Sequence, residues 1–381
     1  MKATTGVHVS APTRWALFLV GVIVLSLMAG LSVVSQIGSL SREVRTELTP
    51  LVRQAVRGVH EGDEAALAAL VDAQADPAWR RTFLSQPQTF VPPLEGPVEV
   101  RQVRSLEGTD IVQATAVGTF DVEGISVPAH VFFYARPVDT SWKLTFPLIT
   151  EHFGVPLAHE LDRVTLVVYS KENRAVTPAL ADVPLLIAEL EAITAQPWPP
   201  LRVVVELLGP PAGWAVSTSG AQVDVRVISS SVGWWSVEPK VDLRARVAWG
   251  ILQAMSSMSP RRRAVAHAVA RFWAGDIDGL HPEFDVPLVR AARPLVRAGR
   301  WPSLEESVVG PLEGYTVDEQ MAIWSTASLW LLANGVPLAD LSRLVDESDA
   351  PLFRKMAMTW FDRPLEEVEA QWQADVEVRY R

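Results

Sequence analysis

The closest match to a catalytic motif is the stretch from Ala158 to Arg163, in which His159 and Glu160 stand side by side. In the zinc motif His-Glu-x-x-His, two imidazoles one helical turn apart hold the metal, and the glutamate activates its bound water. Here Arg163 occupies the position of the second histidine, and the stretch lies in a linker before a predicted strand. We therefore attribute the match to chance.

Other features of the sequence argue against further classes of catalytic and metal site. The sequence has no cysteine, which excludes disulfides, thiolate metal sites and cysteine nucleophiles. It contains neither the Gly-x-Ser-x-Gly turn of serine hydrolases nor a glycine-rich phosphate loop. The acidic run 276–279, with Glu283 and Asp285 beyond it, lacks the ligand spacing of a calcium loop. A solvated turn between helices explains this run more simply.

The composition is that of a folded, acidic protein. A chain of 381 residues is expected to form two or more domains. With 49% hydrophobic and 20% charged residues, it is not mainly disordered. A general nucleic-acid binder needs a basic face, and the net charge of -10 argues against one. We predict no nucleic-acid partner.

A membrane-spanning helix is predicted over residues 15–37. The segment Trp15–Val34 is apolar apart from two serines, and its 20 residues span about 30 Å as a helix, the thickness of the bilayer core. A cleaved signal peptide is the alternative, but Leu27 stands where cleavage after Ala29 requires a small residue. With residues 1–14 as a cytoplasmic tail, we predict a single-pass protein of the cell membrane with an extracytoplasmic C-terminal region.

Residues 41–150 are predicted to form helices followed by four strands. Apolar side chains recur at helical spacing up to about Leu70, and the period changes to two between Val98 and Phe146. This order is similar to the cone-shaped α+β fold of the nuclear-transport-factor-2-like superfamily. The resemblance implies either a substrate pocket or a contact surface. His130 and Glu123 are the ionisable candidates on these strands, and a solvated strand face explains both more simply.

A second region begins near Leu161, with a small sheet followed by helices. Its predicted strands are Val164–Tyr169, Leu201–Leu208 and Gln222–Ser229, and its predicted helices are Ala179–Thr194, Val241–Met255, Arg261–Ala274, Val286–Ala298, Asp318–Ala333, Leu338–Asp346, Pro351–Trp360 and Leu365–Asp375. The predicted fold class of the chain is α+β.

The C-terminal half contains short sequence segments that are similar to those of a known enzyme family. Gln320–Ser325 begins a buried helix that ends at Asn334–Pro337, and the chain closes with Phe361–Trp372. These segments resemble those of the thermolysin-like gluzincin metallopeptidases, in the short bacterial form termed peptidase MA-like. The resemblance covers residues 160–376. It implies a small N-terminal sheet, a helical C-terminal half and a zinc site.

The zinc-motif positions of that family hold other residues here. His267 stands at the position of the third ligand, usually a glutamate. Trp249, Gly250 and Gln253 then stand at the first histidine, the glutamate and the second histidine of the motif.

A second register gives the same outcome. It begins the motif at His267, but Ala268 and Arg271 replace its glutamate and second histidine. Both registers predict a pseudopeptidase with no zinc, no other cofactor and no catalytic residues.

The adjacent Trp234 and Trp235 lie in a loop-like stretch before Pro239. Neighbouring side chains on extended backbone point to opposite sides, so one of the pair is a candidate interface anchor.

We predict that the extracytoplasmic region acts as a binding or scaffolding protein for an envelope protein or peptide. One alternative is an active hydrolase with an unconventional metal site around His267, His281 and Glu283, which requires stoichiometric zinc. Another is a purely structural envelope component.

Overall fold

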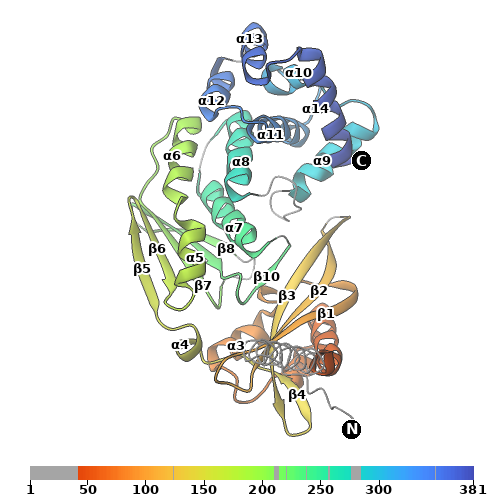
Figure 1. Cartoon of the computed structure of the whole chain (residues 1–381), viewed down its shortest axis with the longest axis vertical. Helices are drawn as coiled ribbons and strands as arrows, with labels where there is room; N and C mark the ends of the chain where they lie inside the picture. The colour runs from red at the N-terminus through yellow and green to blue at the C-terminus, as the bar shows by residue number, and fades with distance from the viewer. Residues whose placement is uncertain are drawn as a thin grey trace, which may run out of the picture.

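The computed structural model describes residues 42–122, 124–209, 214–219, 221–236, 238–255, 258–275, 285–347 and 349–381. This part of the chain is a mixed α+β fold in which two sheets and a helical layer follow one another along the long axis (Figure 1). The first sheet lies near the described N-terminal end, the second lies in the middle, and the C-terminal helices lie at the far end.

The predicted fold class needs one correction, because it included a membrane-spanning helix. Within the described ranges, no helix combines the length and apolar character needed to cross a bilayer. The segment 15–37, on which that prediction fell, lies outside the described residues, as does the tail 1–14. The predicted location of the protein rests on the same segment and stays a prediction.

The first unit packs helices against an antiparallel sheet. Its elements are a helix over residues 42–61, α2 (Glu64–Leu70), α3 (Pro77–Ser85), η1 (Pro87–Thr89), β1 (Glu95–Ser105), β2 (Val112–Val122), β3 (Ile125–Val138) and β4 (Ser141–Leu144). The Asp76 side chain caps the N-terminus of α3 by accepting hydrogen bonds from the backbone N–H groups of Ala78 and Trp79. Trp79 then packs against Phe83 at a centroid distance of 4.8 Å and against Phe146 at 5.6 Å. Helix and sheet are therefore held by an aromatic core.

The first sheet is completed by a strand from much later in the chain. Its order is β1-β2-β3-β10, with β4 also paired to β3, and β10 (Trp234–Trp235) lies antiparallel to β3. Backbone pairing thus joins the unit of residues 42–150 to the C-terminal part of the chain.

A buried polar network reinforces this junction. The Tyr134 hydroxyl accepts from Gln113 Nε2 and donates to the Ser231 carbonyl, both at 2.8 Å. Ser229 Oγ donates to Glu172 Oε1 at 2.6 Å. Glu172 is only 7% exposed, and this burial raises the pKa of its carboxyl group despite the hydrogen bonds from Ser229 and Ser231.

The second sheet has the order β5-β6-β7-β9-β8 and is mixed. Its strands are β5 (Pro156–Leu161), β6 (Val164–Tyr169), β7 (Leu201–Glu206), β8 (Trp214–Ser219) and β9 (Gln222–Ile228), with β6, β7 and β9 parallel and the two edge strands antiparallel. Alternate residues of β6 are buried, as one covered face requires. The helices α5 (Asn173–Leu180), α6 (Val183–Thr194) and α7 (Pro239–Ala254) contact this sheet or the helices beside it.

The remaining helices form the C-terminal layer. A short helix, α4 (Ile149–His152), precedes the second sheet, and the layer itself comprises α8 (Pro260–Ala274), α9 (Asp285–Arg297), α10 (Leu304–Val309), α11 (Val317–Ala333), α12 (Leu338–Glu347), α13 (Ala350–Phe361) and α14 (Leu365–Tyr380). Helix α11 is buried along most of its length and contacts α8, α9 and α10, so the layer is organised around it.

Candidate functional site

The positions that the metallopeptidase resemblance assigns to the zinc motif converge on a cleft between α7, α8, α9 and the start of α11. Trp249 and Gln253 lie one turn apart on α7, and His267 lies on α8; all three line a cavity of about 650 Å³. The fold therefore brings three of the four motif positions together. The cavity has the size of a typical small-molecule or side-chain pocket, which is roughly 300 to 1,000 Å³.

The fourth position, Gly250, faces the second sheet and not the cavity. A Cβ added to Gly250 would lie 2.5 Å from Cγ1 of Val225 on β9. Real Cβ atoms do not approach other atoms so closely, so α7 lies against the sheet at a distance that only glycine allows. A glutamate at position 250 requires α7 to move away from β9.

Trp249 fills the space between the sheet edge and α8. Its ring meets the ring of Trp214 on β8 edge-on at 6.3 Å and the imidazole of His267 edge-on at 5.9 Å. Edge-to-face pairs of this kind contribute about 0.5–1.5 kcal/mol each beyond the area they bury. An indole thus occupies the position that the metallopeptidase resemblance assigns to a zinc-binding imidazole.

His267 is buried and bound to the neighbouring helix. Its Nδ1 lies 3.0 Å from Oγ of Ser325 on α11, and the residue is 8% exposed. Burial, and to a lesser extent the nearby Arg271 guanidinium, lowers the pKa of His267 to about 3. The imidazole is therefore neutral at physiological pH and acts as a hydrogen-bonding group.

The rest of the cleft is largely apolar and rich in methionine. Three methionines and two leucines line it, namely Met255, Met258, Met321, Leu252 and Leu288. Unbranched thioether side chains adapt to ligands of different shape. The charged side chains that line the cleft are Arg263, Arg290, Asp318 and Glu319.

The strand beside the cleft is an open edge. Strand β8 is the last strand of the second sheet and pairs only with β9 in the described part of the chain. Its residues are half-buried at Trp214 and exposed from Ser217 to Ser219. An edge strand presents unpaired backbone N–H and C=O groups to an incoming strand.

The predicted interface pair, Trp234 and Trp235, makes contacts within the chain. Trp235 is 6% exposed and packs on Phe132 at a centroid distance of 4.4 Å. Trp234 meets Phe120 edge-on at 5.2 Å and lies under the Arg246 guanidinium at 5.1 Å. Both indoles therefore help to join β10 to the first sheet.

The other candidate residues form no metal site within the described ranges. Among the described residues, no group of three or more histidine, aspartate or glutamate side chains is placed to hold a metal ion. His281, Glu283 and the acidic run 276–279 lie outside the described residues, as does Glu123. His159 lies on the edge strand β5, where the neighbouring Glu160 accepts a hydrogen bond from Thr165 at 3.0 Å.

Two residues that contact the side chains of the cleft, Trp214 and Ser325, were not predicted from the sequence. Trp214 follows a proline-rich stretch and belongs to a short, half-exposed strand with little apolar alternation. Ser325 is one of several buried hydroxyl residues on the otherwise apolar α11, a pattern that indicates hydrogen-bond partners inside the fold.

No protein-family model matches the chain, and no curated protein matches its sequence.

Proposed function

We propose that the cleft holds an extended segment of another polypeptide, and that the chain is a binding or scaffolding protein built on a peptidase-like framework. The observation that carries this proposal is the position of Trp249, packed between Trp214 of the open strand β8 and the neutral His267. Aromatic surface thus lies directly beside an unpaired backbone edge.

The open edge supplies the backbone contacts. An extended segment adds to a sheet edge through main-chain hydrogen bonds, and neighbouring pockets select among its side chains. Strand β8 contacts α7, whose Trp249 and Gln253 line the cleft, so a strand added outside β8 lies beside that pocket. One ligand segment can therefore use both features.

The cleft supplies the side-chain contacts. Its methionines and leucines favour apolar side chains of varied shape, as in other promiscuous binding surfaces. The charged side chains in the cleft include both signs, which favours no strongly charged ligand. The predicted ligand is an extended segment with apolar side chains and little net charge.

Three features favour binding over zinc-dependent hydrolysis. Gly250 is packed against Val225, which leaves no room for a catalytic glutamate in the present arrangement. Trp249 and Gln253 replace the two motif histidines. The remaining imidazole, His267, is buried with Ser325 as its partner.

The test uses a permanently unfolded protein, α-lactalbumin that is reduced and capped at its cysteines with neutral carbamidomethyl groups. It is labelled with a fluorophore and titrated with the purified full-length chain. We expect binding, and we expect Ala291→Trp, which fills the cleft from α9, to weaken it by about tenfold or more. Ala374→Trp, at an exposed position of α14 that lines neither this cleft nor another cavity, is the matched control and should bind as the wild type does. Equal affinities for the wild type and Ala291→Trp, or no binding at all, contradict the proposal.

A further inference from the structure

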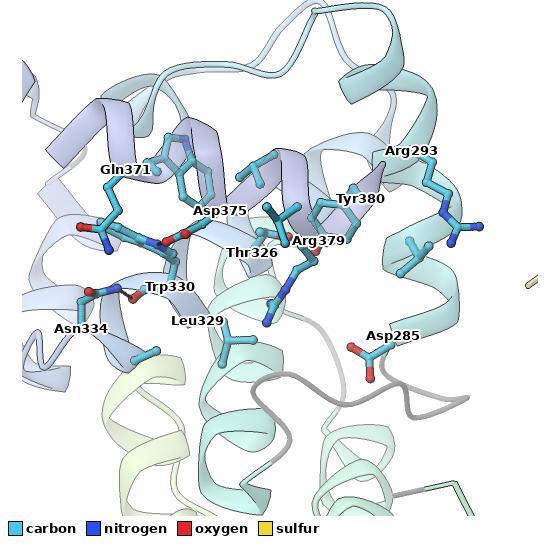
Figure 2. Close-up of a pocket in the computed structure, with 15 residues that line it drawn as sticks. Asp285, Arg293, Thr326, Leu329, Trp330, Asn334, Gln371, Asp375, Arg379 and Tyr380 are labelled. Atoms are coloured by element: carbon cyan, nitrogen blue, oxygen red, sulfur yellow. Dashed lines mark hydrogen bonds between the residues drawn. The ribbon is translucent and has the colours of Figure 1, made fainter. Parts of the chain in front are cut away.

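A second cavity lies on the other side of α11, away from the cleft. It has a volume of about 810 Å³ and is enclosed by α9, α11 and α14 (Figure 2). None of its lining residues lines the cleft. It is therefore a separate site, and an inference drawn from it is independent of the proposed function.

The walls of this cavity follow helical periodicity. On α14, Gln371, Asp375 and Arg379 recur every fourth residue and face the cavity. On α9, Asp285 and Arg293 lie eight residues apart on one face. Each helix thus contributes an acidic and a basic side chain to the same space.

The floor between these charged groups is apolar. Leu329 and Trp330 of α11 and Val289 of α9 line the cavity and are at most 9% exposed overall. The indole N–H of Trp330 donates to Asp375 Oδ2 at 2.8 Å, which fixes the carboxylate beside the floor (Figure 2).

One charged group of each sign has no ionic partner in the described part of the chain. Asp285 pairs with the buried Arg271, and Arg379 also has an interaction of its own. Asp375 accepts from Trp330 but forms no ion pair, and the buried Nε–H of Arg293 has no acceptor. The Arg293 guanidinium thus keeps donors that no carboxylate of the described residues uses, and an acceptor on a ligand can bind to those that face the cavity.

Asp375 and Arg293 lie on opposite sides of the cavity (Figure 2). A matching ligand carries a cation at one end, a carboxylate at the other and apolar surface between them. Short peptides with free termini have this chemistry. We infer that the second cavity binds a short zwitterionic peptide, with its terminal ammonium at Asp375, its terminal carboxylate at Arg293 and an apolar side chain over Leu329 and Trp330.

The experiment is isothermal titration of the full-length chain with Ala-Leu-Ala, Ala-Leu-Leu-Ala and Ala-Leu-Leu-Leu-Ala. Each peptide is used with free termini, N-acetylated and C-terminally amidated. We expect at least one free peptide to bind, and we expect either block to weaken its binding by about tenfold.

Variants at Asp375 and Arg293 test which terminus of the peptide binds at each of these two residues. Asp375→Asn keeps the hydrogen bond from Trp330 but loses the charge, so acetylation should no longer matter, while amidation still should. Arg293→Gln should show the reverse, and Arg293→Lys should retain most of the affinity. Thermal unfolding of each variant confirms that it is folded. The cleft variant Ala291→Trp should bind these peptides as the wild type does, which separates this site from the proposed function.

Binding of blocked and free peptides with equal affinity would show apolar docking only and overturn the inference. Failure of all three free peptides to bind also overturns it. A third contrary result is equal sensitivity of Asp375→Asn and the wild type to acetylation.

Discussion

The Nδ1 atom of His267 lies 3.0 Å from the Oγ atom of Ser325, and this contact ties the cleft-lining helix α8 to the central helix α11. Both side chains are buried, so neither finds a replacement partner in water. The pair therefore contributes to stability as well as to the shape of the cleft.

Replacing Ser325 by alanine should leave the His267 imidazole with one hydrogen bond fewer in a buried site. We expect the free energy of unfolding to fall by about 1–3 kcal/mol. Chemical denaturation of the full-length chain measures this change. Ser328→Ala, a buried serine on the same helix, is the matched control and should cost less. Equal losses for the two variants would show that the contact with His267 contributes nothing measurable.

The lowered pKa of His267 makes stability depend on pH. The unfolded imidazole takes up a proton near pH 6.5, whereas the folded one does so only at about 3. Between these values the unfolded state binds more protons, so stability falls as the pH falls, by up to about 1.4 kcal/mol per pH unit. His267→Gln removes this proton uptake. Between pH 7 and pH 4, the wild type should lose more stability than His267→Gln, and parallel losses would contradict the assignment.

Glu172 has the opposite dependence because burial raises its pKa in the folded state. The folded state then holds the proton more tightly, so this carboxyl contributes its full stability below the unfolded pKa, near 4.5, and loses it as the pH rises through the folded pKa. Glu172→Gln keeps an acceptor for Ser229 without the charge. Relative to wild type, this variant should gain stability between pH 4.5 and pH 7, as measured by urea unfolding at both values. An unchanged difference between the two proteins at the two pH values refutes this prediction.

The close approach of α7 to the second sheet predicts a strong size limit at Gly250. Gly250→Ala places a methyl group 2.5 Å from Cγ1 of Val225, and overpacking of this kind costs about 1–3 kcal/mol. Val225→Ala removes the obstructing methyl group, so the double variant should lose less stability than the two single losses predict together. Strict additivity in this double-mutant cycle would show that the two positions do not contact.

Elements with a strong apolar period were predictable from the sequence. Strand β6 has the predicted bounds Val164–Tyr169, because its alternate residues are buried against the helices. Strand β5 was missed because most of its residues are exposed and show no alternation. Helix α6 begins at Val183, after a turn at Ala181 and Asp182, so the single helix predicted from Ala179 is in fact two.

Long-range contacts explain the remaining differences. Strand β10 has two residues, and it is defined by pairing with β3 about 100 positions earlier, which no local pattern reveals. The motif positions Trp249, Gln253 and His267 line one cavity. Trp249 and Gln253 are one turn apart on α7 and so share a face, and His267 lies on the neighbouring helix α8. Gly250 points elsewhere because adjacent helical residues are not on the same face. The contributions of Trp214 and Ser325 follow from the packing of β8 and α11 on this pair of helices.

The most direct test of the binding cleft is amide hydrogen exchange of the full-length chain, with and without saturating reduced and carbamidomethylated α-lactalbumin. If an extended segment adds to the open edge, exchange should slow at the β8 amides of residues 214–219 and along α7 near Trp249. Exchange in β5, at the opposite edge of the same sheet, should not change. Unchanged exchange in β8 under saturating conditions, or equal protection of β5 and β8, would contradict the account.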